Sequence, residues 1–178
     1  MSLQSKPKKQ KFSGFSVAKA FQYLRLAKLT PWDIQADPAS PSDFFQQRLQ
    51  KLQRFDLRAS EEAKKLLIDA VLEEGLEGFR HLKIWKGANL ETDNVEGYVD
   101  YLVAEDRDYL YAPFLCVIEA KKDDFEQGLA QCPVEMAACQ WNNRQIGRDI
   151  PVFGIVTNGE GWKFYQLLLT GQVEETNL

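Results

Sequence analysis

The chain has 178 residues, of which 44% are hydrophobic, and a chain of this size and composition can bury one ordinary core. Its formal net charge of −4 argues against a protein that coats nucleic acid indiscriminately, but it permits a local basic groove or a carboxylate site that a metal neutralises. The sequence has no apolar run of membrane-spanning length and no hydrophobic signal segment after its basic N-terminus. We therefore expect a cytoplasmic protein without a membrane partner.

The N-terminal third of the chain is predicted to be helical behind a basic tail. Residues 1–13 are polar and rich in lysine, which predicts a flexible tail. Residues 14–59 are expected to form a helical extension of the domain. Within it, apolar spacing predicts a helix over Ser16–Lys28, three prolines follow as an irregular link, and Ser42 is expected to cap a second helix that ends near Gln53.

Residues 60–178 are expected to form the α/β core of the same compact domain. Ser60 is the predicted N-cap of the first helix in this part. Glu74 falls on the predicted inward face near the end of that helix, where it either needs a partner or is only a terminal carboxylate before Gly75. The predicted buried stripe of the helix consists of Ala63, Leu67, Ala70 and Val71.

From Arg80 onward the hydrophobic period changes to that of β-strands. A long helix is predicted after these strands, over about Asp124–Asn142, and Pro133 inside it predicts a kink or a break near Leu129. The predicted strands span about Leu82–Lys86, Val95–Ala104 and Phe114–Lys121.

The C-terminal part has the pattern of a β-hairpin. Its strands are expected at Pro151–Thr157 and Trp162–Leu169, with a turn at Asn158–Gly161. The long helix before it would act as a crossover, so the first hairpin strand is expected to lie parallel to Phe114–Lys121. The predicted architecture is a mixed β-sheet flanked by helices.

Thiol and imidazole chemistry receive little support from the sequence. The three cysteines, Cys116, Cys132 and Cys139, lie in apolar segments without CxxC spacing, which indicates reduced, buried thiols. The single histidine, His81, cannot build a histidine-rich zinc site.

Charged residues gather at the end of one apolar strand. Glu119 and Lys121 are two residues apart, so they project from the same face of a strand. If the preceding strand pairs with this one so that Ala104 lies opposite Leu115, then Asp100 lies opposite Glu119. Two carboxylates and one ammonium on an apolar sheet are unfavourable unless a cation lies among them, and a divalent metal is the simplest candidate.

These groups suit the hydrolysis of a phosphodiester. Mg²⁺ prefers carboxylate and carbonyl oxygens and keeps several waters, so Asp100, Glu119 and the backbone carbonyl of Ala120 are candidate ligands. A divalent cation makes a water molecule easier to deprotonate and screens the phosphate charge. Lys121 would orient the attacking water and stabilise the negative charge of the transition state.

The pattern resembles a known group of enzymes. A glycine-x-x-aspartate, a Glu-x-Lys that ends the next strand and a glutamine on the following helix are similar to the motif of the PD-(D/E)XK nuclease superfamily, and closest to its RecB-like exonucleases. Residues 152–165 also resemble segments that close the nuclease domain of type I restriction subunits. The matched motif positions are Gly97, Asp100, Glu119, Lys121 and Gln131.

The resemblance covers roughly residues 60–169 and implies a restriction-endonuclease-like fold, dependence on Mg²⁺ or Mn²⁺, and cleavage of DNA or, less often, RNA. It places the upstream catalytic acid of the family on Glu74. Glu135 stands where the RecB-like pattern has a tyrosine. Gln131 and Glu135 are expected to contact the substrate strand or to bond to each other, unless they form a solvated helix face.

Two other interpretations stay open. The chain could be a catalytically silent module of the same fold that binds nucleic acid or a protein. Alternatively, Asp100, Glu119 and Lys121 could form a structural ion-pair network in an ordinary α/β protein. A homodimer is also open, because nucleases of this type often pair to cut two strands.

Overall fold

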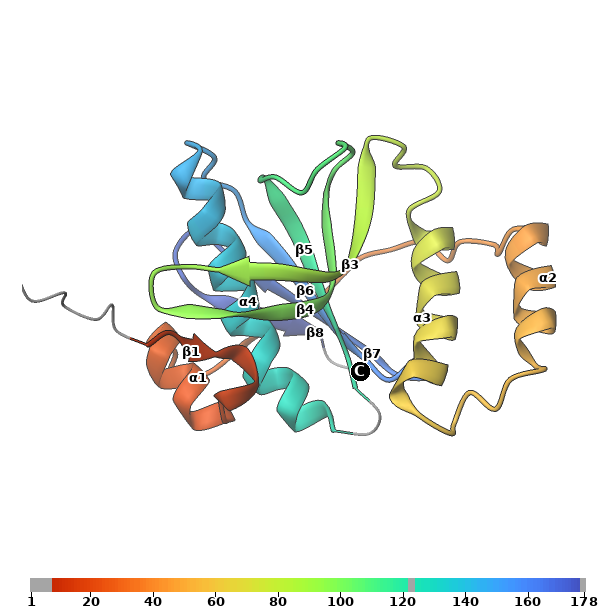
Figure 1. Ribbon diagram of the computed structural model, residues 1–178, viewed down its shortest axis with the longest axis horizontal. Coiled ribbons are helices and arrows are strands. Elements are labelled where there is room, and N and C mark those ends of the chain that lie inside the picture. Colours follow the sequence, from red (N-terminus) through yellow and green to blue (C-terminus); the bar gives the residue numbers. More distant parts are fainter. Residues whose placement is uncertain (1–7, 122–123, 177–178) are drawn as a thin grey trace, which may run out of the picture.

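The computed structural model describes residues 8–121 and 124–176 of the chain. In this part, eight strands form one mixed sheet with helices on both faces (Figure 1), which confirms the predicted α/β class. The elements in chain order are β1 (Gln10–Lys11), the 3-10 helix η1 (Phe12–Gly14), α1 (Val17–Leu24), β2 (Thr30–Trp32), α2 (Asp43–Leu52), α3 (Glu61–Gly75), β3 (Leu82–Glu91), β4 (Val95–Glu105), β5 (Phe114–Ala120), α4 (Phe125–Gln145), β6 (Val152–Thr157), β7 (Trp162–Leu167) and β8 (Val173–Thr176).

The strand order is β1-β4-β5-β6-β7-β8-β2, and β3 pairs with β4 in addition. Helices α1 and α4 cover one face of the sheet, whereas α3 lies against the other face with α2 beyond it (Figure 1). The predicted parallel pairing of β5 with β6 across the α4 crossover is confirmed. None of the described helices is long and apolar enough to span a membrane.

The N-terminal segment is more closely joined to the domain than the sequence indicates. β1 pairs in parallel with β4, and Phe12 is completely enclosed in the main core. The predicted tail boundary at residue 13 is therefore corrected, because residues 10–13 belong to the folded domain; residues 1–7 lie outside the described part. The predicted extension 14–59 also supplies an edge strand, since β2 pairs with β8 and its Trp32 stacks on Phe153.

The N-caps of α2 and α3 are confirmed, but the buried face of α3 is corrected. Ser42 and Ser60 each accept a hydrogen bond from a backbone N–H three residues later. In α3 the buried apolar residues are Ile68, Ala70 and Leu72, so Ala70 agrees with the predicted stripe, whereas Ala63, Leu67 and Val71 are only partly buried. Apolar side chains occupy most positions from 66 to 72, so the sequence leaves the rotation of this helix to be set by packing.

The β3–β4 hairpin is longer than predicted and irregular near its middle. Val99 and Leu102 share one core although they are three residues apart, so strict alternation is interrupted around Asp100. Farther along, β4 and β5 shift register, and Ala104 pairs with Phe114 rather than with the expected Leu115. The pairs nearer to Asp100, such as Tyr101 with Ile118, keep the predicted register.

Helix α4 lies very close to β6 and runs unbroken through Pro133, so the predicted break near Leu129 is absent. Two glycines permit this approach. A Cβ on Gly128 would lie 2.3 Å from Val156 Cγ1, and a Cβ on Gly154 would lie 2.5 Å from Met136 Sδ. The close packing fixes the side chains of the first half of α4 against the end of β5.

We expect Gly128→Ala to lower the free energy of unfolding by about 1–3 kcal/mol, because the added methyl overlaps a stiff, buried valine. Alanine has a helix propensity about 1 kcal/mol more favourable than that of glycine, so the gain in propensity offsets part of the loss from steric overlap. Gly75→Ala in α3 is the matched control, since nothing lies within 4 Å of its added Cβ. Urea unfolding of both variants measures the difference. Equal stability of the two variants would contradict the close packing.

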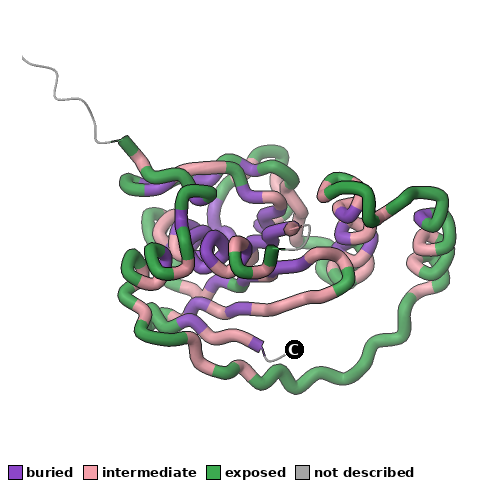
Figure 2. Tube along the Cα trace, turned by 90° about the horizontal axis from the view of Figure 1, so that it is seen from below, coloured by how far each residue is buried: buried purple, intermediate pink, exposed green. Residues whose placement is uncertain are grey.

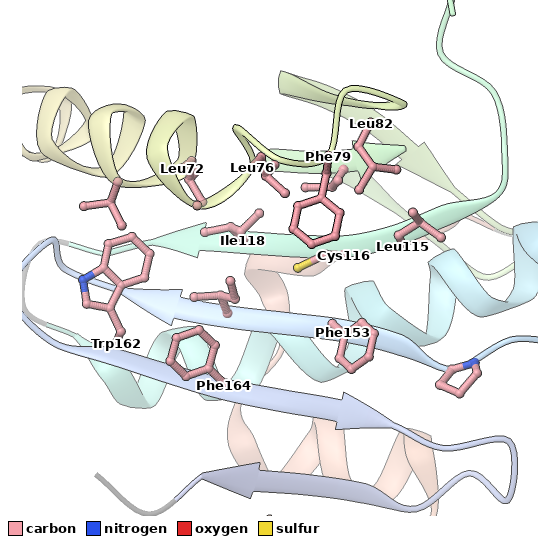
Figure 3. Close-up of a pocket in the computed structure, with 15 residues that line it drawn as sticks. Leu72, Leu76, Phe79, Leu82, Leu115, Cys116, Ile118, Phe153, Trp162 and Phe164 are labelled. Atoms are coloured by element: carbon pink, nitrogen blue, oxygen red, sulfur yellow. The ribbon is translucent and has the colours of Figure 1, made fainter. Parts of the chain in front are cut away.

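Two apolar cores lie on opposite faces of the sheet. The larger one lies under α1 and α4, and the smaller one joins α3 to β4 and β5. Figure 2 shows the buried segments gathered around the sheet, while the link between β2 and α2 is exposed along its length. The face beneath α3 is only partly covered, and it holds an apolar cavity of about 600 Å³ (Figure 3).

Candidate active site

The structure brings Asp100 to the end of β5. The backbone N–H of Ala120 donates a hydrogen bond of 2.8 Å to Asp100 Oδ2. This contact follows from the register of β4 against β5, which places Asp100 beside Glu119 as the sequence predicts. The interruption of alternation in β4 lies at the same residue.

Glu119 and Lys121 lie on the α4 side of the sheet, also as predicted. Lys121 Nζ is 2.8 Å from Glu119 Oε1 and donates a second hydrogen bond, 2.9 Å long, to Gln131 Oε1 of α4. Gln131 also accepts a hydrogen bond from Gln127 one turn earlier in the helix. Gln131 is buried, and its amide holds the ammonium of Lys121 in place.

Glu135 lies deeper than the sequence suggests. Its side chain is 0% exposed, and neither carboxylate oxygen accepts a well-formed hydrogen bond among the described residues, although Gln131 one turn earlier in α4 lies close enough to offset part of the rise in its pKa that burial causes. A contact between Glu135 and a substrate strand is therefore ruled out in this conformation. One carboxylate oxygen of Glu119, Oε2, is also buried without a hydrogen-bond donor, whereas Oε1 binds Lys121.

The electrostatics of this cluster differ from those of a solvated ion pair. Burial raises the pKa of Glu119 to about 7, and the nearby charge of Asp100 adds to the effect although Lys121 opposes it. Burial also raises the pKa of Glu135 well above its ordinary value, with the charge of Glu119 as the second cause. For Lys121, burial lowers the pKa, but the charge and hydrogen bond of Glu119 outweigh it and the net shift is upward.

Sequence reasoning missed one member of the site, Lys65 of α3. Its Nζ lies 3.0 Å from Asp100 Oδ1. The same ammonium lies 3.0 Å from Glu62 Oε1 and 3.5 Å from Glu61 Oε1. In the sequence these three residues have the spacing of an exposed helical ion pair, which hides the contact with Asp100. Only the rotation of α3, with Ile68 facing the sheet, indicates that Lys65 reaches the strand.

Glu74 does not join the cluster. Its two carboxylate oxygens accept hydrogen bonds of 2.7 Å from the backbone N–H and from the hydroxyl of Ser42. The predicted catalytic role of Glu74 is thus replaced by a structural one. Glu74 lies near the C-terminal end of α3, and the rotation of that helix turns its carboxylate toward α2 rather than toward β5. The carboxylate therefore holds Ser42, the residue that caps α2.

We expect Glu74→Gln to lower the free energy of unfolding by about 1–2 kcal/mol, since two hydrogen bonds to a charged acceptor are weakened. Any cleavage activity should stay unchanged. Glu73→Gln is the matched control, because Glu73 bonds to Arg48 through both carboxylate oxygens in a partly exposed pair that should contribute about 1 kcal/mol or less. Urea unfolding and a cleavage assay test both effects, and a large loss of cleavage in Glu74→Gln alone would restore its catalytic role.

The residues present fit a hard divalent cation that keeps part of its water shell. Glu119 Oε2 is buried without a donor, and the carboxyl group of Asp100 lies close enough to share a proton with Glu119, so either a proton or a cation would satisfy this pair of carboxylates. Among residues 8–121 and 124–176, no group of three or more His, Cys, Asp or Glu side chains could hold a metal ion. The candidate ligands are still those expected from the sequence, Asp100, Glu119 and the Ala120 carbonyl, with water to complete the shell, a set that Mg²⁺ and Mn²⁺ accept.

The apolar cavity beneath α3 is separate from this cluster. Ile118 and Cys116 of β5 point into it (Figure 3). Glu119, next to Ile118 in the strand, binds Lys121 on the α4 side of the sheet. None of the described residues that line the cavity has a charged side chain. Its described lining is almost entirely apolar, so it does not contribute to the charged cluster.

Comparisons with known proteins add no assignment. No protein-family model matches the chain, and no curated protein or solved structure matches it. The class that the fold defines is a mixed α/β domain with a charged cluster where β4, β5, α3 and α4 meet.

Proposed function

We propose that this protein is a metal-dependent nuclease of restriction-endonuclease-like fold that hydrolyses phosphodiester bonds in DNA. The main support is the convergence of Asp100, Glu119 and Lys121 at the end of β5, with one carboxylate oxygen of Glu119 unpartnered. The arrangement of an antiparallel β4–β5 pair, a parallel β5–β6 pair and the intervening α4 agrees with the proposal. Mg²⁺ or Mn²⁺ is the proposed cofactor.

Each residue of the cluster has a distinct proposed role. Asp100 and Glu119 hold the cation together with the Ala120 carbonyl, and the cation supplies Lewis-acid chemistry at the phosphate. Lys121 keeps its proton, because Glu119 raises its pKa, so it acts as an orienting and charge-stabilising group rather than as a base. Gln131 positions Lys121 through its Oε1.

The alternative is a catalytically silent module of the same fold, and one observation favours it. Both oxygens of Asp100 have protein partners, the ammonium of Lys65 and the N–H of Ala120. A network of this kind can be purely structural, as many buried ion pairs are. Calorimetry with Mn²⁺ separates the two functions, since the nuclease should bind the ion and Asp100→Asn should not.

The proposed activity is tested with plasmid, linear duplex DNA, single-stranded DNA and RNA, each with Mn²⁺, with Mg²⁺ and with EDTA. Cleavage of at least one DNA substrate is expected with either ion and not with EDTA. Asp100→Asn, purified in parallel, guards against a contaminating nuclease. If none of the substrates is cut and Mn²⁺ does not bind, the silent module is the better assignment.

A further inference from the structure

Lys65 occupies the place where a ligand of Asp100 would bind. Its Nζ is 3.0 Å from Asp100 Oδ1, and Asp100 Oδ2 is already engaged by the N–H of Ala120. A second cation near Oδ1 would meet the ammonium of Lys65 at close range. This inference rests on the proposed function, in which Asp100 binds a metal ion. In the structure, the ammonium of Lys65 blocks the carboxylate oxygen of Asp100 that the ion would need.

The ammonium of Lys65 has other carboxylates within reach. Glu62 Oε1 is 3.0 Å from Nζ and Glu61 Oε1 is 3.5 Å from it, both in the first turn of α3. The side chain of Glu62 is 82% exposed and that of Glu61 is 43% exposed, so both can follow the lysine as it moves. Lys65 can therefore leave Asp100 without losing its ion pairing.

The attachment of α3 to the sheet does not depend on this contact alone. Ile68 and Leu72 pack into the smaller core with Tyr101 and Ile118. The hydroxyl of Tyr101 also donates a 2.9 Å hydrogen bond to Asp69 Oδ1. Release of Lys65 from Asp100 would thus leave the helix in place.

We propose that Lys65 is a displaceable cation that closes Asp100 in the free protein and yields it to the divalent ion. The ammonium then stays with Glu61 and Glu62 beside the site. A divalent ion carries twice the charge of the ammonium, so at equal distance its attraction to the Asp100 carboxylate is about twice as strong. The consequence is that Lys65 weakens metal binding in the absence of substrate.

The experiment is a calorimetric titration of Mn²⁺ into the full chain without nucleic acid. Lys65→Met should bind Mn²⁺ roughly 3- to 10-fold more tightly than the wild type, the range expected from removal of one partly buried ion pair. The double variant Glu61→Gln, Glu62→Gln should bind it more weakly, because Lys65 is then left with Asp100. Lys65→Met combined with Asp100→Asn should lose binding, which shows that the gain acts through Asp100.

Lys86→Met is the matched control for the change in net charge. Its Nζ pairs with Asp69 Oδ2 at 2.8 Å, so the substitution removes one lysine from the same region without touching Asp100. The Kd for Mn²⁺ should stay close to the wild-type value. Urea unfolding of each variant confirms that the fold is retained.

The outcomes separate this inference from the proposed function. Mn²⁺ binding that requires Asp100 but is unchanged or weakened in Lys65→Met overturns the inference and leaves the nuclease assignment standing. Binding in neither the wild type nor Lys65→Met overturns both. Binding in Lys65→Met alone supports the inference in its strongest form, with the site fully closed in the wild type.

Discussion

Asp100→Asn and Lys121→Met are each expected to lower the rate of Mn²⁺-dependent DNA cleavage by about 10²–10³-fold or more while leaving the protein folded. Asp100→Asn removes a negative charge that the cation needs, but the amide oxygen can still accept the hydrogen bond from Ala120 N–H. Lys121→Met keeps the length of the side chain and removes the ammonium between Glu119 and Gln131. Cleavage rates under single-turnover conditions measure the effect on the chemical step.

Two variants elsewhere in the sheet serve as controls for these substitutions. Asp106→Asn changes a residue just after β4, at the end of the strand that is far from the cluster, where Asp106 pairs with Lys83. Lys163→Met removes a lysine of β7 that pairs with Glu175. Both should cleave at the wild-type rate. Full activity in either Asp100→Asn or Lys121→Met would remove the basis of the active-site assignment.

The free energy of unfolding is expected to fall as the pH rises from about 4.5 to about 7, through the titration of Glu119. Its pKa is raised from 4.5 to about 7, first by burial and then by Asp100, so the native state keeps a proton that the unfolded chain has released. Stability is therefore greatest below the lower value and is lost as the pH passes the higher one. The loss should be on the order of 3 kcal/mol.

Urea unfolding at a series of pH values, without divalent ions, tests this expectation. Glu119→Gln should flatten the profile, because the amide does not titrate. Glu135→Gln should flatten it as well, since burial raises the pKa of that group in the same direction. The groups around Glu119 that influence the result are Asp100 of β4, Lys121 after β5 and Glu135 of α4. A profile of unchanged slope in both variants would contradict the raised pKa values.

The local part of the candidate site could be predicted from the sequence. Alternation along a strand places Glu119 and Lys121 on one face whatever the rest of the chain does. The apolar runs on both sides also define the hairpin that brings Asp100 beside them. Helical spacing places Gln131 on α4, although the partner of its amide, Lys121, becomes evident only in the structure.

Three short strands of the sheet were beyond sequence reasoning for a different reason. β1, β2 and β8 contain two, three and four residues, too few to show a period. They form because the edges of the larger strands offer unpaired backbone groups. The same interactions turn part of the expected tail and extension into sheet.

The sequence by itself determined the class of fold, the order of the main strands and helices, and the three charged residues, one from β4 and two from the end of β5, that form the candidate site. These features depend on periodicity and on residues close together in the chain. The rotation of α3 was decided only by the tertiary structure, because an almost continuous apolar run fits several orientations. That rotation brings Lys65 to Asp100 and turns Glu74 toward Ser42. The depth of Glu135 likewise depends on how closely α4 packs on β6, which two glycines permit.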